Sequence, residues 1–307
     1  MIMRLIQGFC MALADSVPGV SGGTVAFLLG FYDKFIGSIN DLIRGNKEQR
    51  IEAIKFLIKI GIGWIIGLCM AILFITSVFE EHIYAISSLF IGFILFAIPI
   101  IVSEEKECLK KNYFGMSFIL VGAALVGGIT AFSGSTILSD GVNLAAGKFD
   151  VKVGILLFLA GMIAISAMVL PGISGSTILM IFGLYIPITN AIKDILHLKL
   201  EYVPAVAIFG VGVILGALWV VKLIQQMLEK FRPQTVYFII GMMFGSLYSI
   251  IMGPTTLKDE SGVNLGNSRL TWNKFSILFF VIGGIVIFGL QFMKYILEKK
   301  NGKGLSN

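Results

Sequence analysis

PGVSGGTVAFLLGFY occupies residues 18–32, and PGISGSTILMIFGLY occupies residues 171–185. The two stretches share Pro, Gly, Ser, Gly, Thr, Gly and Tyr at seven of fifteen positions, with a constant offset of 153 residues. Each follows an apolar run, and its Pro-Gly pair removes a backbone donor and loosens the chain. The repeat therefore predicts an internal duplication in which each copy carries a broken apolar helix.

Short apolar arms flank each break, at residues 2–17 and 24–36 in the first copy and at residues 154–170 and 177–188 in the second. A helical arm of about 12–16 residues extends about 18–24 Å. That length is less than the roughly 30 Å of a bilayer core. We therefore expect two re-entrant helical hairpins, one over residues 2–36 and one over residues 154–188.

Six other apolar stretches are long enough to span a bilayer, at about 54–78, 83–102, 114–133, 203–228, 234–253 and 274–297. The duplication extends into them, because Gly61-x-Gly63-x-x-x-Gly67 returns as Gly210-x-Gly212-x-x-x-Gly216 at an offset of 149 residues. Such small-residue spacing predicts close contact between helix backbones.

These features predict an all-α integral membrane protein with a single membrane domain. Repeat 1 covers residues 1–133, an extracytoplasmic connecting loop covers 134–153, and repeat 2 covers 154–307. Each repeat consists of a re-entrant helical hairpin followed by three transmembrane helices. Three crossings are an odd number, so we expect the second repeat to be inverted relative to the first.

Charge supports this topology through the positive-inside rule. Of the 24 Lys and Arg residues, 17 fall in segments that the topology places inside, and both termini are then cytoplasmic. These inside segments are the N-terminus, 34–59, 103–113, 222–233 and 294–307; the outside loops are 79–83, 134–153, 187–202 and 254–274. Hairpins that crossed completely as helix pairs would keep the same parity, so charge leaves re-entrance open.

Composition excludes several classes of function. The chain is 57% hydrophobic and 14% charged, whereas a soluble domain has about a quarter of its residues charged. The net charge of +6 comes from clusters between apolar runs, which indicates membrane orientation and not nucleic acid. Two histidines and three cysteines, none with ligand spacing, predict no metal site and no cofactor: His82, His197, Cys10, Cys69 and Cys108.

The N-terminus, with Arg4 and Ala12-Leu13-Ala14, resembles a short signal peptide. The segment that runs on from Gly8 has an internal counterpart near Gly161, and an internal copy cannot be a cleaved leader. We therefore expect the N-terminal segment to belong to the membrane domain.

The tips of the two hairpins are candidate anion sites. Where a second arm begins, its first N–H groups have no helical partner and the helix dipole places positive potential there. Glycines allow an anion to approach the backbone, and hydroxyls can donate hydrogen bonds. The candidate phosphate-binding residues are Ser21, Gly22, Gly23, Thr24, Ser174, Gly175, Ser176 and Thr177; the hairpin breaks are Pro18, Gly19, Pro171 and Gly172. The alternative is that these residues only pack helices closely.

Two charged residues near the first break are further candidates. Asp15 precedes Pro18 by three residues, and an acidic group within a membrane is expensive and often functional. It could take up a proton during transport, or it could be a helix-end carboxylate in a water-filled vestibule. Lys34 could attract a lipid phosphate, although a position at the membrane interface is the plainer interpretation.

The decapeptide DSVPGVSGGT at residues 15–24, together with PGISGS at residues 171–176, resembles the bacterial and archaeal polyprenyl-phosphate transporter family over essentially the full length. The resemblance implies a multi-pass protein of the prokaryotic cytoplasmic membrane that moves undecaprenyl phosphate from the outer to the inner leaflet, for reuse in cell-wall synthesis. The Asp before the first motif matches the family pattern. Ile186 stands where an acidic residue is expected, which weakens a paired-acid mechanism.

The resemblance makes undecaprenyl phosphate and the lipid bilayer the expected partners, with the phosphate held at the two hairpin tips. A neutral cradle of donors would offset the desolvation of the phosphate group. Two other classes stay open: a transporter or channel for a small soluble anion, and a non-transporting envelope assembly protein. No nucleophile-and-base set is apparent, so we expect no enzyme activity. Sequence leaves the oligomeric state open.

Overall fold

The computed structural model describes residues 2–15, 21–70, 76–110, 113–132, 144–253 and 268–300. Within these ranges every regular element is helical, which confirms the predicted all-α class. The first half contains α1 (Ile2–Asp15), α2 (Gly22–Leu28), α3 (Tyr32–Arg44), α4 (Lys47–Met70), α5 (Thr76–Glu104), α6 (Lys106–Leu109) and α7 (Ser117–Phe132). The second half contains α8 (Val151–Val169), α9 (Gly175–Ile181), α10 (Tyr185–Leu196), α11 (Val203–Lys230), α12 (Arg232–Met252) and α13 (Ile277–Lys300). Short 3-10 turns lie at η2 (Tyr113–Met116), η3 (Leu200–Tyr202) and η5 (Trp272–Lys274).

Five helices in the described part of the chain are long and apolar enough to cross a membrane: Lys47–Met70, His82–Glu104, Val151–Val169, Leu200–Lys230 and Arg232–Met252. The pair α9 and α10, bent by 111°, would bring the number to six if it formed one broken span. Ser117–Phe132 and Ile277–Gly289 are shorter apolar helices. Large apolar side chains such as Ile65, Leu120 and Ile285 are exposed on the outer faces, as expected for surfaces that contact lipid.

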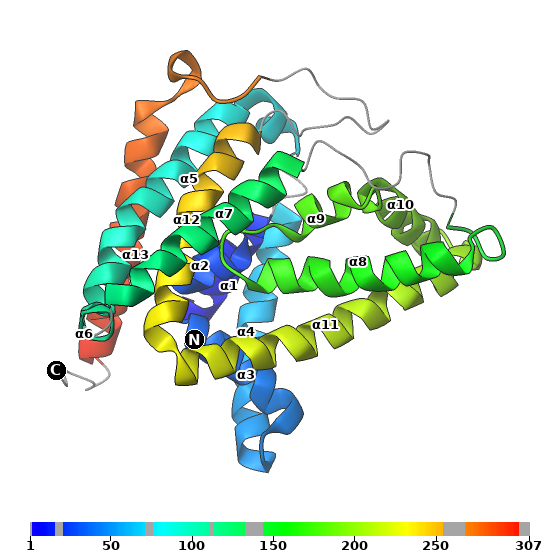
Figure 1. Ribbon diagram of the computed structural model, residues 1–307, viewed down its shortest axis with the longest axis horizontal. Coiled ribbons are helices and arrows are strands. Elements are labelled where there is room, and N and C mark those ends of the chain that lie inside the picture. The colour runs from blue at the N-terminus through cyan, green and yellow to red at the C-terminus, as the bar shows by residue number, and fades with distance from the viewer. Residues whose placement is uncertain are drawn as a thin grey trace.

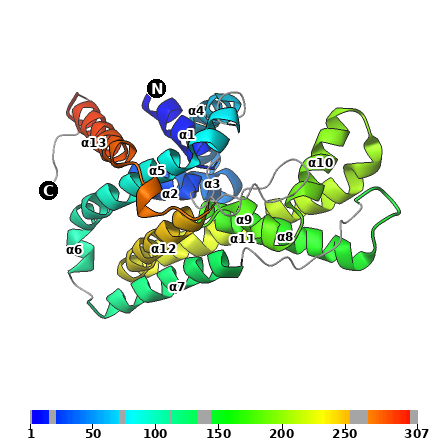
Figure 2. The same ribbon diagram turned by 90° about the horizontal axis from the view of Figure 1, so that it is seen from above.

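The helices associate in four long pairs. α1 packs along α4, α8 along α11, α5 along α13, and α7 along α12. Figure 1 shows α8 and α11 crossing the direction of α4 at a steep angle, with α5, α7, α12 and α13 forming a separate bundle. Viewed from above, α8, α10 and the adjoining part of α11 project from this bundle as a lobe (Figure 2). The lobe has its own apolar core around Leu157, Leu184 and Ile188.

Glycines at related sequence positions make related contacts in these pairs. A Cβ atom on Gly63 in α4 would overlap the Leu5 backbone of α1, and one on Gly212 in α11 would overlap the Phe158 backbone of α8. By contrast, Gly61 has nothing within 4 Å. The predicted packing face is therefore confirmed at Gly63 and Gly212, and wrong at Gly61. Gly67 and Gly216 also contact the backbone of the neighbouring helix, as predicted, whereas Gly210, like Gly61, has nothing within 4 Å.

The second arm of each hairpin is shorter than predicted. Arms were expected over 24–36 and 177–188, but α2 ends at Leu28 and α9 ends at Ile181, before a turn. Gly30 (φ 66°) and Gly183 (φ 70°) take the left-handed conformation in these turns. Both turns carry the paired backbone bonds of a Schellman motif, which stops a helix because only glycine adopts this φ without strain. Each arm is thus followed by a separate helix, α3 or α10.

The first arm of the second hairpin is longer than predicted. Residues 154–170 were expected to be too short to cross, but α8 has 19 residues and extends about 28 Å. Its start is fixed by Asp150, whose carboxylate accepts a hydrogen bond from the Val153 N–H at 2.9 Å. Because Asp150 and Lys152 are polar, apolar patterning alone placed the start too late.

Two segments predicted as loops contain helix. α3 and the start of α4 cover residues 34–59 except Gly45 and Asn46, and α10 and η3 occupy most of residues 187–202. Charged and apolar residues alternate at helical spacing in these segments, so they lack the continuous apolar character by which spanning helices were recognised. The six predicted spans otherwise overlap helices, with boundaries that differ most at α4 and α5, which both begin seven residues earlier than predicted.

Candidate functional site

The first hairpin tip is built by a side-chain cap. Ser21 has an extended backbone (φ −130°, ψ 153°), and its Oγ accepts a hydrogen bond from the Thr24 N–H at 3.2 Å. This is the usual way for serine to satisfy a free donor at a helix start, and it makes Ser21 the N-cap of α2. The Ser21 and Thr24 hydroxyls also lie 3.0 Å apart and are almost fully buried.

The first tip contacts the break of the second hairpin directly. Ser21 Oγ donates to the Leu170 carbonyl oxygen at 3.1 Å, and the Gly172 N–H donates to Thr24 Oγ1 at 2.7 Å. Leu170 follows the last residue of α8, where backbone carbonyls lack helical partners. Two predicted site residues from one half of the chain therefore complete the hydrogen bonding of a break in the other half.

Two further contacts tighten this junction. The Tyr32 hydroxyl, at the start of α3, donates to the Val169 carbonyl oxygen at 3.2 Å. A Cβ atom on Gly23 would overlap this same carbonyl group, so the two backbones approach more closely than any other residue would allow. Gly172 itself has φ 90°, and a Cβ atom there would lie 2.7 Å from the Met242 carbonyl oxygen of α12. The two tips therefore form one buried junction.

The second tip uses its hydroxyls differently. Ser174 precedes α9 but makes no capping hydrogen bond, and its Oγ instead lies 2.6 Å from the Ser176 Oγ. Ser174 is buried, whereas Ser176 and Thr177 are half-buried. A Cβ atom added to Gly175 would lie 3.0 Å from the Ala164 carbonyl oxygen of α8. The hydroxyls of this tip therefore lie nearer the surface of the junction than those of Ser21 and Thr24.

Asp15 lies beneath the first tip. Its Oδ1 accepts a hydrogen bond from the Gly22 N–H at 2.7 Å, and its Oδ2 accepts one from Trp64 Nε1 at 3.0 Å. One of the N–H groups predicted to face an anion is thus bonded to a carboxylate of the same chain. Sequence reasoning missed Trp64, because no spacing rule relates residues 49 positions apart on different helices.

The remaining predicted residues fall elsewhere. Pro18 and Gly19, the first break, lie outside the described residues. Lys34 lies on α3, 3.5 Å from Glu52 and over the ring of Phe56, in an ion pair exposed to solvent. Among the described residues, His, Cys, Asp and Glu side chains do not gather in threes that could hold a metal ion.

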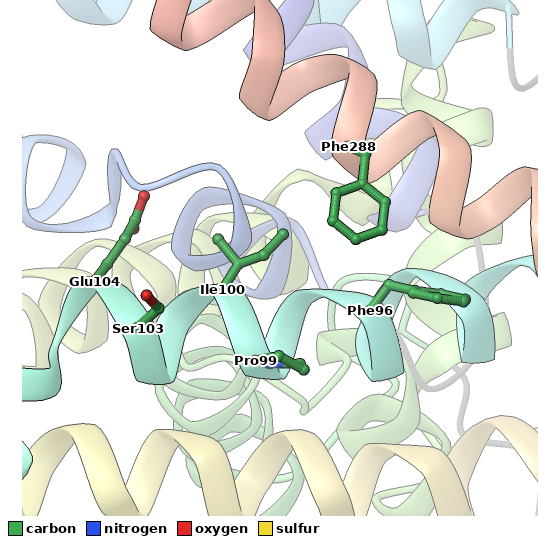
Figure 3. Close-up of a pocket in the computed structure, with 6 residues that line it drawn as sticks. All are labelled: Phe96, Pro99, Ile100, Ser103, Glu104 and Phe288. Atoms are coloured by element: carbon green, nitrogen blue, oxygen red, sulfur yellow. The ribbon is translucent and has the colours of Figure 1, made fainter.

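A mostly apolar recess of about 330 Å³ opens between α5 and α13. Figure 3 shows Phe288 of α13 pointing toward α5, with Ser103 and Glu104 at one end of the recess; the lining residues are Phe96, Pro99, Ile100, Ser103, Glu104 and Phe288. Three residues beyond Phe288, Gln291 donates a 3.4 Å hydrogen bond to the Leu28 carbonyl oxygen. This bond joins α13 to the end of α2, the helix that begins at the first tip.

Comparison with known proteins gives consistent matches. Residues 11–265 match the family described as undecaprenyl phosphate translocase-like. A polyprenyl-phosphate transporter of Vibrio cholerae serotype O1 is 29% identical over 255 residues, covering 80% of this chain and 76% of the relative. A polyprenyl-phosphate transporter of Staphylococcus aureus is 30% identical over 260 residues, covering 83% of this chain and 88% of the relative. No solved structure matches the chain significantly.

Proposed function

Since this chain belongs to the undecaprenyl phosphate translocase-like family, we propose that it carries a polyprenyl phosphate, such as undecaprenyl phosphate, between the leaflets of the prokaryotic cytoplasmic membrane. The two curated relatives are named polyprenyl-phosphate transporters. The direction that suits recycling of a cell-wall lipid carrier is from the outer to the inner leaflet. The protein acts as a transporter in this proposal.

The observation that carries the proposed site is the buried junction of the hairpin tips. Ser21 and Thr24 meet the backbone at Leu170 and Gly172, so the first motif and the break at the second motif form one polar cluster between helices. Buried hydroxyls and free helix-start N–H groups can replace the water around a phosphate. In this conformation the first tip is engaged with protein groups, and the phosphate therefore first meets Ser174, Ser176 and Thr177.

The phosphate then replaces the protein groups that are bonded to the first tip. Ser21, Gly22, Gly23 and Thr24 become available when the first tip separates from the second break, and Gly175 allows close approach at the second tip. The isoprenoid tail stays in an apolar environment, and the recess between α5 and α13 offers one.

The topology we propose has two inverted repeats and both termini on the cytoplasmic side. Related glycine contacts in α4 and α11 support the duplication. In Figure 1, α6 and the start of α1 lie at one end of the α5–α13 pair and η5 lies at the other end. This separation agrees with the division of Lys and Arg residues between inner and outer segments.

Leaflet-resolved transport tests the site. Labelled undecaprenyl phosphate in proteoliposomes is followed by its protection from an added membrane-impermeant phosphatase. We expect Ser174→Ala/Ser176→Ala to reduce protein-dependent flipping about tenfold or more, because two donors to a charged group are lost. Thr189→Ala is the matched control, since its hydroxyl bonds to the Tyr185 carbonyl oxygen in exposed α10.

Three results would separate the alternatives. Flipping that survives the double substitution would move the phosphate site away from the second tip. Uptake of free phosphate without lipid flipping by the wild type would replace the proposed substrate with a soluble anion. Absence of both activities in folded protein, under an imposed proton gradient, would favour an assembly role.

A further inference from the structure

Three charged side chains form a cluster at one edge of the molecule. Arg232, the first residue of α12, donates from Nε and NH2 to the two carboxylate oxygens of Glu105, at 3.0 and 2.5 Å. Its NH1 donates to Asp33 Oδ2 at 2.7 Å. Both carboxylates are therefore held by one guanidinium group, whose planar fork matches Glu105 bidentately.

The cluster joins parts of the chain that are far apart in sequence. Asp33 lies at the start of α3, and Glu105 directly follows α5; they are 199 and 127 residues from Arg232. The other ion pairs of the described residues are more local, within the α10–η3 connection at Lys199–Asp194 or between the neighbouring helices α3 and α4. Arg232 thus ties the first hairpin and the end of α5 to the second half.

The cluster is mechanically connected to the hairpin junction. Asp33 follows Tyr32, whose hydroxyl bonds to the Val169 carbonyl oxygen at the end of α8. Holding Asp33 therefore holds the start of α3 and, through it, the first tip against the second break. Two carboxylates around one guanidinium leave a net charge of about −1. The Arg232 donors that a phosphate would need are already bonded to these carboxylates, so the cluster is unsuited to bind the substrate itself.

The cluster has no counterpart in the other repeat. At the offset of 153, Asp33 corresponds to Ile186, and at the offset of 149, Arg232 corresponds to Ile83. Both counterparts are uncharged, and Ile83 is buried. All three charged residues lie in or beside segments that the positive-inside rule places on the cytoplasmic side. Among the described residues, this ionic connection between the two repeats lies on the side that the positive-inside rule makes cytoplasmic.

We propose that Arg232, Asp33 and Glu105 form an inner-side latch that keeps the hairpin junction closed toward the cytoplasm and must open in every transport cycle. The proposal rests on the proposed transport function. Opening exposes the junction to the inner leaflet, where the phosphate leaves. Because the latch holds the junction closed toward the cytoplasm, the resting protein favours access from the outer leaflet.

Reversible cross-linking tests whether the latch must open. In a protein with Cys10, Cys69 and Cys108 replaced by serine, Asp33→Cys/Arg232→Cys is bridged by a short bifunctional methanethiosulfonate reagent. We expect lipid flipping to fall to the protein-free rate and to return when the bridge is reduced. Asp194→Cys/Lys199→Cys is the matched control, because its bridge stays within the α10–η3 connection and should leave flipping unchanged. Continued flipping by the bridged Asp33–Arg232 protein would overturn the proposal.

Accessibility gives a second readout that does not depend on transport. In the same cysteine-free protein, Ser176→Cys reports on the junction through its reaction with an impermeant maleimide in inside-out vesicles. We expect Arg232→Gln to increase this labelling several-fold and Arg232→Lys, which keeps the charge but loses the fork, to have an intermediate effect. Unchanged labelling in Arg232→Gln would contradict the latch. Failure of the proposed function would look different, because the unbridged wild type would then move no lipid.

Discussion

Asp15 is held at the first tip by two hydrogen bonds, and these contacts bear on its proposed role in transport. Its two carboxylate oxygens accept hydrogen bonds from the Gly22 N–H and from Trp64 Nε1. The carboxylate therefore fills the position at the first tip where an external anion would otherwise meet a backbone donor. A proton on Asp15 would weaken its hold on Gly22, which is a concrete way for protons to couple to phosphate binding.

Asp15→Asn separates these two roles. An asparagine offers one acceptor and places its NH2 group against a donor, so we expect a loss of about 1–3 kcal/mol in the free energy of unfolding. If Asp15 takes up a proton, flipping by this variant should also lose the pH dependence of the wild type. The flipping rate is measured from about pH 5.5 to about pH 8. Unfolding in detergent is measured separately.

Trp64→Phe is the companion variant, because it removes one donor and keeps the carboxylate. Its stability should fall, while the pH dependence of flipping should remain that of the wild type. An Asp15→Asn protein that flips lipid with unchanged pH dependence would eliminate proton coupling through this residue.

The hairpins show which residues determine where a helix ends. Pro171-Gly172 ends α8, and the left-handed Gly30 and Gly183 end α2 and α9. These are local signals, and the first was recognised from sequence. The Gly30 and Gly183 stops were present in the repeated motif but were read as part of a continuous apolar arm. The second arm of each hairpin is therefore a short helix, α2 or α9, and a separate helix, α3 or α10, follows it.

Helix pairing offers a prediction at the same scale. Gly63→Ala places a methyl group against the Leu5 backbone and should lower the free energy of unfolding by about 1–3 kcal/mol, since α1 and α4 must separate. Gly61→Ala, two residues away with nothing within 4 Å, should be neutral or stabilising by roughly 0.5–1 kcal/mol. Unfolding of both variants in mixed micelles with increasing SDS provides the comparison.

The related pair in the second half extends this test. Gly212→Ala should be as damaging as Gly63→Ala, and Gly210→Ala should be as harmless as Gly61→Ala. Equal effects of all four substitutions would show that glycine contributes through backbone flexibility and not through close packing.

At the scale of the molecule, the pairing of α5 with α13 and of α7 with α12 interlocks the two halves. The second transmembrane helix of each proposed repeat packs against the third helix of the other. Neither half can therefore bury its own helices alone. This arrangement brings the hairpin tips together and lets Arg232 reach across to Asp33 and Glu105.

Cysteine labelling checks the orientation of the whole molecule. In a cysteine-free background, Gln49→Cys and Glu107→Cys should react with an impermeant maleimide only in inside-out vesicles. Thr271→Cys, beside η5, should react only in right-side-out vesicles. All three positions are exposed, so differences in labelling report the side of the membrane and not burial. Labelling of Gln49→Cys and Thr271→Cys from the same side would disprove the proposed topology.

The sequence by itself determined the membrane class, the duplicated Pro-Gly motif, most helix positions and the small-residue face at Gly63 and Gly212. These depend on composition and on short-range periodicity, which are present in the chain before it folds. The amphipathic helices α3 and α10 escaped detection because their charged residues interrupt the apolar run.

Tertiary structure alone decided how the motif residues are used. Ser21 and Thr24 are engaged with the opposite break, Ser174 and Ser176 with each other, and Asp15 with Trp64. Arg232 gains its role only because α3, α5 and α12 meet at one edge. Apart from the Ser174–Ser176 contact, these contacts join residues that are 49 to 199 positions apart, and no local pattern encodes which of the available donors and acceptors will meet after the helices pack.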